Sequence, residues 1–394
     1  MNALEWRATA ALSLLQALRM LGMFMILPVF ALYAEHLPQA ATPMQVGLAI
    51  GLYGLVQACL QIPLGMWSDR IGRKPVIVLG LVIFSAGSFI AGHAEEIHWI
   101  LLGRAVQGAG AISGAVSALL SDVTRPQVRT QAMAVMGAGM GLAFVIALIL
   151  GPIVSGLINV DGIFDLTGVL ALLAVPAVLF LVPDVPVMKT QREGLMKTLL
   201  DGQLLRLDGG VFMLHATMTM LFIAAPQALV DTLHLPSAQH WQVYLPVLLL
   251  SLLPVFPLIR RIEARGAVKR AFLGAIGLLA LALLTASELH GNAIGLWLAL
   301  FLFFAGFNYL EGTLPSLISR RAPPEHKGAA LGVYASSQFL GGFIGGTLGG
   351  FASGHWGVGG TFAVAACLPL IWFTFAVTLQ PPPSLRHLQS SSGH

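Results

Sequence analysis

The chain has 394 residues, of which 57% are hydrophobic and only 10% are charged, and its mean hydropathy is +0.83. A soluble globular domain carries about 25% charged residues, so this composition excludes a protein that is surrounded by water on all sides. The formal net charge is +4. In a membrane protein such an excess reflects where the basic residues lie, and it does not indicate nucleic-acid binding.

Apolar segments of about 20 residues follow one another along the chain, and each is long enough to cross a bilayer as an α-helix. They cover residues 10–33, 44–67, 75–93, 97–121, 131–157, 164–182, 209–232, 241–261, 269–288, 293–318, 328–351 and 359–379. No cleavable signal peptide is evident, because the first apolar segment is too long for one. The sequence therefore predicts an all-α membrane protein with twelve transmembrane helices.

The basic residues predict the orientation of these helices. If the N-terminus is cytoplasmic, 19 of the 21 Lys and Arg residues fall on the cytoplasmic side, and the remaining two, Arg19 and Arg104, lie inside spans. Cytoplasmic loops of membrane proteins carry an excess of basic residues, and one missed span would scramble the distribution. We therefore expect both termini to lie in the cytoplasm and the protein to be a multi-pass protein of the bacterial inner membrane.

The two halves of the chain repeat each other. A proline, an acidic residue and a glycine recur with the same spacing after the second and the eighth span: Pro63, Asp69 and Gly72, then Pro257, Glu263 and Gly266. Because each half has six spans, the repeat is parallel, about an axis along the membrane normal. We expect an N-terminal half at 1–183, a cytoplasmic linker at 184–208, a C-terminal half at 209–380 and a polar tail at 381–394. The linker fits either an amphipathic helix on the membrane surface or a solvated segment.

The loop after the second span, residues 65–74, reads Gly-Met-Trp-Ser-Asp-Arg-Ile-Gly-Arg-Lys. Gly72 permits a tight turn, and Asp69 is an anion among basic residues, positioned to meet Arg73, Arg129 or the N-terminus of a helix. The segment resembles motif A of the major facilitator superfamily, with Trp67 at the leucine position. The resemblance implies a conformational lock between the two halves on the cytoplasmic side. The alternative is a loop that only keeps its charges inside.

The resemblance to motif A assigns eight residues to this lock: Gly65, Asp69, Arg70, Gly72, Arg73, Lys74, Asp122 and Arg129. Two further segments resemble motifs of the same family. Residues 104–110 match motif B, and Arg104 faces either a cavity and a partner or the outer interface. Residues 147–156 resemble the antiporter-associated motif C, with Ala147 and Ser155 at two of its glycine positions, and Gly151 and Pro152 would bend the helix. A generic kinked span is the alternative.

The resemblance covers all twelve spans, and it is closest to the YajR-type bacterial transporters, a subgroup regarded as proton-driven drug exporters. That subgroup typically carries a soluble C-terminal domain. We expect this domain to be missing here, because the chain ends in a short polar tail. In the eleventh span, two sets of glycines recur every four residues: Gly341, Gly345 and Gly349, then Gly342, Gly346 and Gly350. We expect them to pack where the halves slide past each other.

In this family the first, fourth, seventh and tenth spans line a central cavity. The resemblance therefore implies cavity residues on these spans: Arg19, Met23, Arg104, Gln107, Asn308 and Glu311. For proton coupling we expect Glu311, with Arg19 and His215 as further candidates, because a carboxyl group in low-dielectric surroundings can exchange protons near neutral pH. A static ion pair is the alternative role for Glu311, and a structural role is the alternative for Arg19.

The leading interpretation is a proton-coupled antiporter that exports small hydrophobic or drug-like molecules by alternating access. A metabolite symporter or facilitator of the same fold, or a non-transporting membrane sensor, are the alternatives. No G-x-x-x-x-G-K-[ST] motif occurs in the sequence, and we do not expect an enzyme. The expected partners are a small-molecule substrate, protons and membrane lipid. We expect a monomer that binds no nucleic acid, cofactor or metal.

Overall fold

The computed structural model describes residues 1–184, 195–253, 255–323 and 326–380, and these residues are almost entirely helical. The first half contains α1 (Ala3–Met25), α2 (Leu27–Glu35), α3 (Pro43–Ile71), α4 (Arg73–Gly92), α5 (Ile97–Ala109), α6 (Ser113–Val123) and α7 (Pro126–Leu181). The second half contains α8 (Leu195–Leu199), α9 (Gly202–Leu233), η1 (Ser237–Gln239), α10 (Trp241–Leu252), α11 (Val255–Ala264), α12 (Val268–Leu289), α13 (Ala293–Arg321) and α14 (Lys327–Ala376).

The helices agree with the twelve predicted spans once three junctions are taken into account: one inside α7, one inside α14 and one between α5 and α6. Within the described residues, nine helical segments are long and apolar enough to cross a membrane. Two of them, α7 and α14, each contain two spans that meet at the non-helical residues Asn159 and Gly357. The shorter helices α5 and α6 together cover the fourth predicted span. The predicted all-α membrane fold is confirmed.

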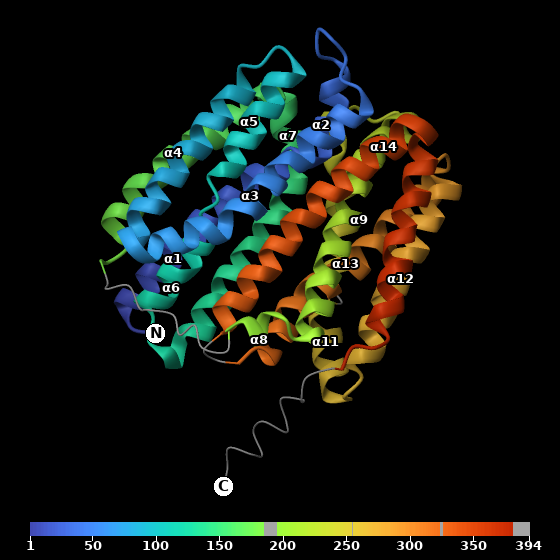
Figure 1. The fold of residues 1–394 in the computed structure, drawn as a ribbon. Helices are drawn as coiled ribbons and strands as arrows, with labels where there is room; N and C mark the ends of the chain where they lie inside the picture. The colour runs from blue at the N-terminus through green and yellow to red at the C-terminus, as the bar shows by residue number, and fades with distance from the viewer. Residues whose placement is uncertain (185–194, 254, 324–325, 381–394) are drawn as a thin grey trace.

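The helices gather in two groups that correspond to the two halves of the chain (Figure 1). The blue-to-green helices α1 to α7 form one group, the yellow-to-red helices α9 to α14 form the other, and α3 and α14 meet between them. We call the end that carries the N-terminus and the loops near residues 72, 124, 266 and 322 the basic end. The opposite end, with the loops at 36–42, 93–96, 234–240 and 290–292, is called the far end.

Glycines allow α14 to approach its neighbours at backbone distance. A methyl group placed on Gly350 would lie 3.1 Å from the Cα atom of Met44 on α3, and Gly346 meets the backbone of Gly47. A methyl group on Gly345 would lie 2.6 Å from the Cα atom of Ala216 on α9. Gly346 and Gly350 thus pack against the other half, as expected, whereas Gly345 packs within its own half.

The internal repeat is visible in the backbone of two equivalent turns. Gly72 joins α3 to α4 with a φ of 102°, and Gly266 joins α11 to α12 with a φ of 64°. Both values lie in the left-handed region, which glycine enters without the steric cost that a side chain imposes. The two glycines that the repeat predicts as equivalent therefore make the same kind of turn.

The segment that links the halves contacts the C-terminal half. Thr198 Oγ1 and His326 Nδ1 are 2.8 Å apart, and Arg321 Nη2 lies 3.4 Å from Asp201 Oδ2. Asp201 also caps α9 by accepting hydrogen bonds from the backbone N–H groups of Gln203 and Leu204. The part of the predicted linker at 185–194 and the predicted tail at 381–394 lie outside the described residues.

Candidate functional site

The polar pair His215 and Glu311 lies in the C-terminal half. His215 is on α9 and buried, whereas Glu311 is on α13 with a side chain that is 33% exposed. The His215 Nε2 and Glu311 Oε2 atoms are 3.8 Å apart, within ion-pair distance but too far for a hydrogen bond. The structure thus brings together two of the three residues proposed for proton coupling.

The hydrogen bonds of His215 describe a neutral ring. Its Nδ1–H donates to the carbonyl oxygen of Val211 at 3.2 Å. Its Nε2 accepts from the amide nitrogen of Gln338 on α14 at 2.8 Å. A nitrogen that accepts a hydrogen bond carries no proton, so the imidazole in this arrangement has one proton and no charge. The carboxylate of Glu311 therefore has a polar neighbour in His215, but no positive counter-charge there.

Aromatic side chains close the bundle on the far-end side of this pair. Phe307, one helical turn from Glu311 toward the far end, packs against Phe144 of α7 with ring centroids 5.5 Å apart. Phe144 meets the ring of Phe24 on α1 at 4.8 Å, and Phe307 lies 6.0 Å from the ring of His215. These rings come from both halves and cover the pair on that side. Glu311 consequently lies on the basic-end side of these rings.

Two other expected cavity residues lie near this region with different surroundings. Asn308, on α13 like Glu311, donates from Nδ2 to Ser251 Oγ on α10 at 3.0 Å. Its amide therefore connects two helices of the same half. Met23 on α1 is partly buried and packs against the apolar core.

Arg104 is buried inside the N-terminal half. Its Nε donates to the carbonyl oxygen of Ala49 at 3.0 Å, and its Nη1 donates to Gln107 Oε1 at 2.9 Å. Its guanidinium lies 5.0 Å from the ring centroid of Tyr53, a distance typical of a cation–π contact. Gln107 in turn donates to Ser88 Oγ at 2.8 Å. All these partners are neutral and belong to the same half, so Arg104 joins α3, α4 and α5.

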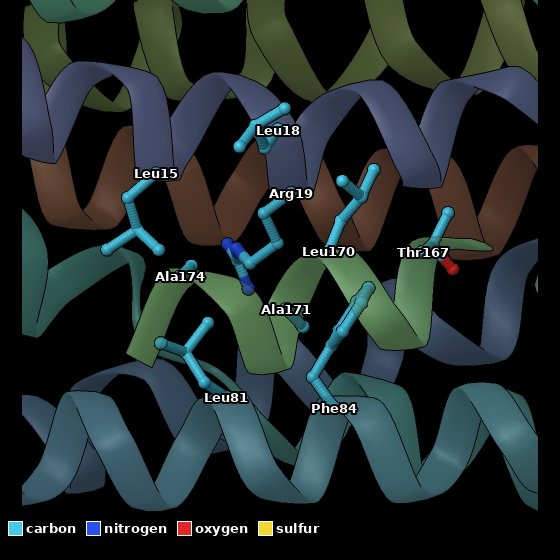
Figure 2. Close-up of a pocket in the computed structure, with 9 residues that line it drawn as sticks. All are labelled: Leu15, Leu18, Arg19, Leu81, Phe84, Thr167, Leu170, Ala171 and Ala174. Atoms are coloured by element: carbon cyan, nitrogen blue, oxygen red, sulfur yellow. The ribbon is translucent and has the colours of Figure 1, made fainter. Parts of the chain in front are cut away.

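Arg19 also points into the N-terminal half. Figure 2 shows its side chain directed from α1 into the space between α4 and α7. Arg19 Nη1 donates to Gln57 Oε1 at 3.2 Å and to the carbonyl oxygen of Gly110 at 3.3 Å, and Nη2 contacts Ser113 Oγ. Among the described residues, Arg19 makes no ion pair. The structure does not bring it to Glu311 and His215.

A charged cluster at the basic end contains the residues that resemble motif A. Arg73 is buried, and its Nε lies 3.0 Å from Asp122 Oδ2, which is equally buried. The same guanidinium pairs with Asp69 and donates to Ser68 Oγ at 2.7 Å. The Ser68 hydroxyl donates to the carbonyl oxygen of Gly65 at 2.6 Å. Arg73 is therefore the centre of a network that connects α3, α4 and α6.

The remaining residues of this cluster are placed around it. Lys74 pairs with Asp184 at 2.8 Å, and Arg70 is exposed. Arg129 has a buried Nε and Nη2 for which the described residues supply no hydrogen-bond partner. Within the described part of the chain, no ion pair of this cluster reaches the C-terminal half. The cluster thus lies within one half in this arrangement of the bundle.

The Gly-Pro pair of α7 lies where α1 ends and α2 begins. A methyl group on Gly151 would lie 3.1 Å from Pro28 Cγ and would meet the backbone of Met25. The helix continues through Pro152, and the non-helical backbone of α7 occurs at Asn159, which has a φ of 58°. The structure thus shows close packing at Gly151, with the break in the helix farther along.

Asp208 is a buried carboxylate that the sequence reasoning missed. The expected seventh span begins at residue 209, but α9 begins at Gly202 and includes Asp208, which is 7% exposed. Its Oδ1 has no hydrogen-bond partner among the described residues. Glu311 is therefore not the only carboxylate inside a span. The capping residue Asp201 was the signal in the sequence for the earlier helix start.

Comparisons with known proteins agree with the fold and the repeat. The family model described as "Major Facilitator Superfamily" matches twice, at residues 12–209 and 207–393. The chain is 43% identical to the "Inner membrane transport protein YajR" of Escherichia coli (strain K12) over 98% of its own length and 86% of that protein.

Two further comparisons extend this picture. The chain is 34% identical to the class D tetracycline resistance protein of Salmonella ordonez, over 24% of each chain. It also resembles the crystal structure of a bacterial homologue of the human lysosomal transporter Spinster in an inward-facing and occupied conformation. That likeness has a TM-score of 0.75, with 15% identity, and covers 96% of this chain and 98% of the other.

Proposed function

The chain belongs to the major facilitator superfamily, and we propose that it is a proton-coupled antiporter that exports small hydrophobic or drug-like molecules. It is a multi-pass membrane transporter and not an enzyme. The observation that carries the finer proposal is the pair Glu311 and His215, 3.8 Å apart, on the basic side of the aromatic contact between the halves. A partly exposed carboxylate at this position can exchange protons with the adjoining aqueous side.

The surroundings of the pair favour an apolar substrate. Phe307, Phe144 and Phe24 form a contiguous aromatic cluster next to Glu311, with Met23 on the same helix as Phe24. Aromatic and methionine side chains adapt to apolar ligands of different shapes. The partial similarity to a tetracycline resistance protein supports export of this kind of molecule.

The distribution of charge supports an orientation with the basic end in the cytoplasm. In this orientation the substrate would reach Glu311 from the cytoplasm, and the far end would be closed by the aromatic contact. Arg73, Asp69 and Asp122 would lock the cytoplasmic side after the halves have rocked to the opposite state. Two nitrogens of Arg129, Nε and Nη2, have no hydrogen-bond partner among the described residues, and this supports the role, because rocking of the halves could supply one.

The proposal is tested by flux measurements on the purified full-length protein in proteoliposomes. With an acidic lumen, efflux of protons should drive uptake of ethidium, and collapse of the pH gradient should stop it. Glu311→Gln should lower the pH-driven flux by about 100-fold, because an amide exchanges no proton, while Glu311→Asp should retain part of it. Gradient-independent ethidium flux would identify a facilitator, uptake driven by the opposite gradient a symporter, and absence of flux a sensor.

A further inference from the structure

A cavity at the far end of the bundle lies between the two halves. Its volume of about 330 Å³ falls within the range of pockets that hold small molecules. Residues of α2, and of α7 around the break at Asn159, form the wall on the side of the N-terminal half, and Ser237 of η1 forms the opposite wall. Neither Glu311 nor His215 lines it. The cavity is therefore separate from the site described above.

The cavity depends on a close contact between η1 and α7. A methyl group on Gly156 of α7 would lie 2.8 Å from the Cβ atom of Ala238, so the backbone of α7 lies directly against η1. Ser237, which lines the cavity, precedes Ala238. The Nε2–H group of the buried His240 donates to the carbonyl oxygen of Leu235 at 3.1 Å and closes the turn that contains η1. If η1 moved away from α7, the cavity would lose one wall.

Asp161 is the acidic group of this cavity. The Tyr33 hydroxyl donates to Asp161 Oδ1, and this hydrogen bond from a neutral group leaves the negative charge in place. Among the described residues that line the cavity there is no Lys or Arg. The far-end loops at 36–42, 93–96, 234–240 and 290–292 contain no Lys or Arg either. A cation that enters the cavity therefore meets a carboxylate without a competing Lys or Arg.

Two further polar groups of the lining can accept hydrogen bonds from such a cation. The Nδ1–H group of His36 donates to the carbonyl oxygen of Leu32 at 2.7 Å, so the Nε2 atom of the neutral ring carries a lone pair. The Ser237 hydroxyl oxygen is an acceptor on the opposite wall. A primary ammonium group has three N–H donors and matches one carboxylate with two neutral acceptors, whereas a quaternary ammonium ion has no N–H donor.

The remaining lining includes apolar side chains. Val29 and Leu32 of α2 and Val160 of α7 belong to it. Contact of an alkyl chain with these side chains is favourable, because apolar surface leaves water. The ligand that fits both the polar and the apolar part is a primary amine with a short alkyl chain.

We propose that this cavity binds a primary alkylammonium ion and that the bound ion holds the far end closed. The ammonium group binds to the Asp161 carboxylate, and the alkyl chain packs against Val29, Leu32 and Val160. Because the ligand contacts both halves, it binds the closed far end and not an arrangement in which η1 has left α7. The proposal does not depend on proton-coupled export.

The test measures binding of butylammonium to the purified full-length protein in detergent by isothermal titration calorimetry at neutral pH, where a primary amine is charged. The natural protein should bind it saturably, and butan-1-ol, which has the same chain without the charge, should bind about tenfold more weakly or worse. Asp161→Asn should weaken butylammonium binding about tenfold. The matched control is Asp231→Asn, which removes an exposed far-end carboxylate outside the cavity lining and should leave the affinity unchanged.

A second pair of variants tests the closure. Gly156→Leu should force η1 away from α7 and weaken butylammonium binding about tenfold, although Gly156 does not line the cavity. Gly141→Leu is the control on the same helix and should bind normally, because the described residues place no atom of a neighbouring helix within 4 Å of a methyl group there. Natural affinity in Gly156→Leu would overturn the proposed closure.

The site itself is overturned if a folded Asp161→Asn binds butylammonium with the affinity of the natural protein, or if butan-1-ol binds as tightly as butylammonium. If Asp161→Asn does not fold, Ser237→Phe decides, because its ring would occupy the cavity from the η1 side. Lost binding in Ser237→Phe supports the site, and unchanged binding overturns it.

Discussion

The ring of His215 and the carboxylate of Glu311 approach each other from two helices to 3.8 Å, and Gln338 on a third helix holds the ring by a 2.8 Å hydrogen bond. The imidazole nitrogen that faces the carboxylate is the one that accepts from this amide. Protonation of His215 would replace that acceptor by a donor next to Glu311. The contact therefore changes in strength with the protonation of either partner, and α9, α13 and α14 all meet at it.

The first prediction is that His215 and Glu311 act as a coupled unit. His215→Gln alone should lower the proton-driven flux about threefold to tenfold, because the carboxylate loses its polar neighbour. The same change should have almost no effect in the Glu311→Gln background. Flux in proteoliposomes for the two single variants and the double variant measures this coupling. If the flux of the double variant falls by the product of the two factors measured for the single variants, the two residues do not share a role.

The second prediction separates two aspartates that pair with Arg73. Asp122 is as buried as Arg73, so Asp122→Asn should destabilise the protein by about 3 kcal/mol, which a large fall in melting temperature in detergent would show. Asp69 has a side chain that is 36% exposed, so Asp69→Asn should cost less than about 1 kcal/mol.

Asp69→Asn should nevertheless slow transport if Asp69 serves the lock between the halves. Flux and melting temperature, measured on the same two variants, check this contrast. Equal destabilisation by both substitutions would show that exposure does not govern the contribution of these ion pairs.

A third prediction concerns the glycine contacts of α14. A methyl group on Gly346 would overlap the backbone of Gly47 on α3, so Gly346→Ala should destabilise the contact by about 1–3 kcal/mol. Gly342 provides a matched control four residues earlier, where a methyl group would lie 3.7 Å from Thr219 Oγ1. Gly342→Ala should leave the melting temperature unchanged or raise it slightly, since alanine favours a helix. Similar effects of both substitutions would argue against close packing at Gly346.

A fourth prediction concerns acid and the junction between linker and α9. Burial opposes ionisation of Asp201, but hydrogen bonds from the Leu204 backbone and from Arg321 outweigh it and hold the pKa of that carboxyl below its ordinary value. A carboxyl group with a lowered folded-state pKa stabilises the protein above its unfolded pKa of about 3.9, and this contribution disappears as the pH falls through the lower folded value.

The melting temperature of the natural protein should therefore fall between pH 5 and pH 3 by more than that of Asp201→Asn, which keeps a capping side chain but cannot ionise. Asp231→Asn serves as the control and should retain the full acid-induced fall. A profile for Asp201→Asn that is identical to that of the natural protein would exclude this contribution.

Most of the fold was predictable because the bilayer acts on local stretches of sequence. An apolar segment of sufficient length must become a helix, so the spans could be read one at a time. The repeated glycines Gly72 and Gly266 were also readable, because a tight turn after a basic segment imposes the same backbone requirement in both halves. The glycine pattern of α14 predicted close packing, although not that Gly345 would face its own half.

The site was predictable only in part, because the direction of a side chain depends on how its helix is rotated in the bundle. Glu311 and His215 do meet, as expected for the helices that carry them. Arg19 on α1 was expected at the same site, but its side chain points toward α4 and α7 instead. Asp208 was not expected inside a helix for another reason. Hydropathy marks where a helix becomes apolar, whereas α9 begins directly after its cap, at Gly202, seven residues before the predicted span.

Arg19 and Arg104 are buried in the N-terminal half, and the partners shown for them are neutral. Asp208 and Glu311 lie in the C-terminal half, where the hydrogen bonds of the described residues give neither of them a positive partner. When the carboxyl groups are ionised, the two halves thus carry opposite charges inside the membrane. Each elementary charge that crosses a potential of 100 mV changes in energy by about 2.3 kcal/mol. In the proposed antiport cycle, rocking of the halves would displace the arginines in every cycle, while proton uptake would neutralise the carboxylates in only part of it. In that cycle the membrane voltage would therefore act differently on the loaded and on the empty carrier.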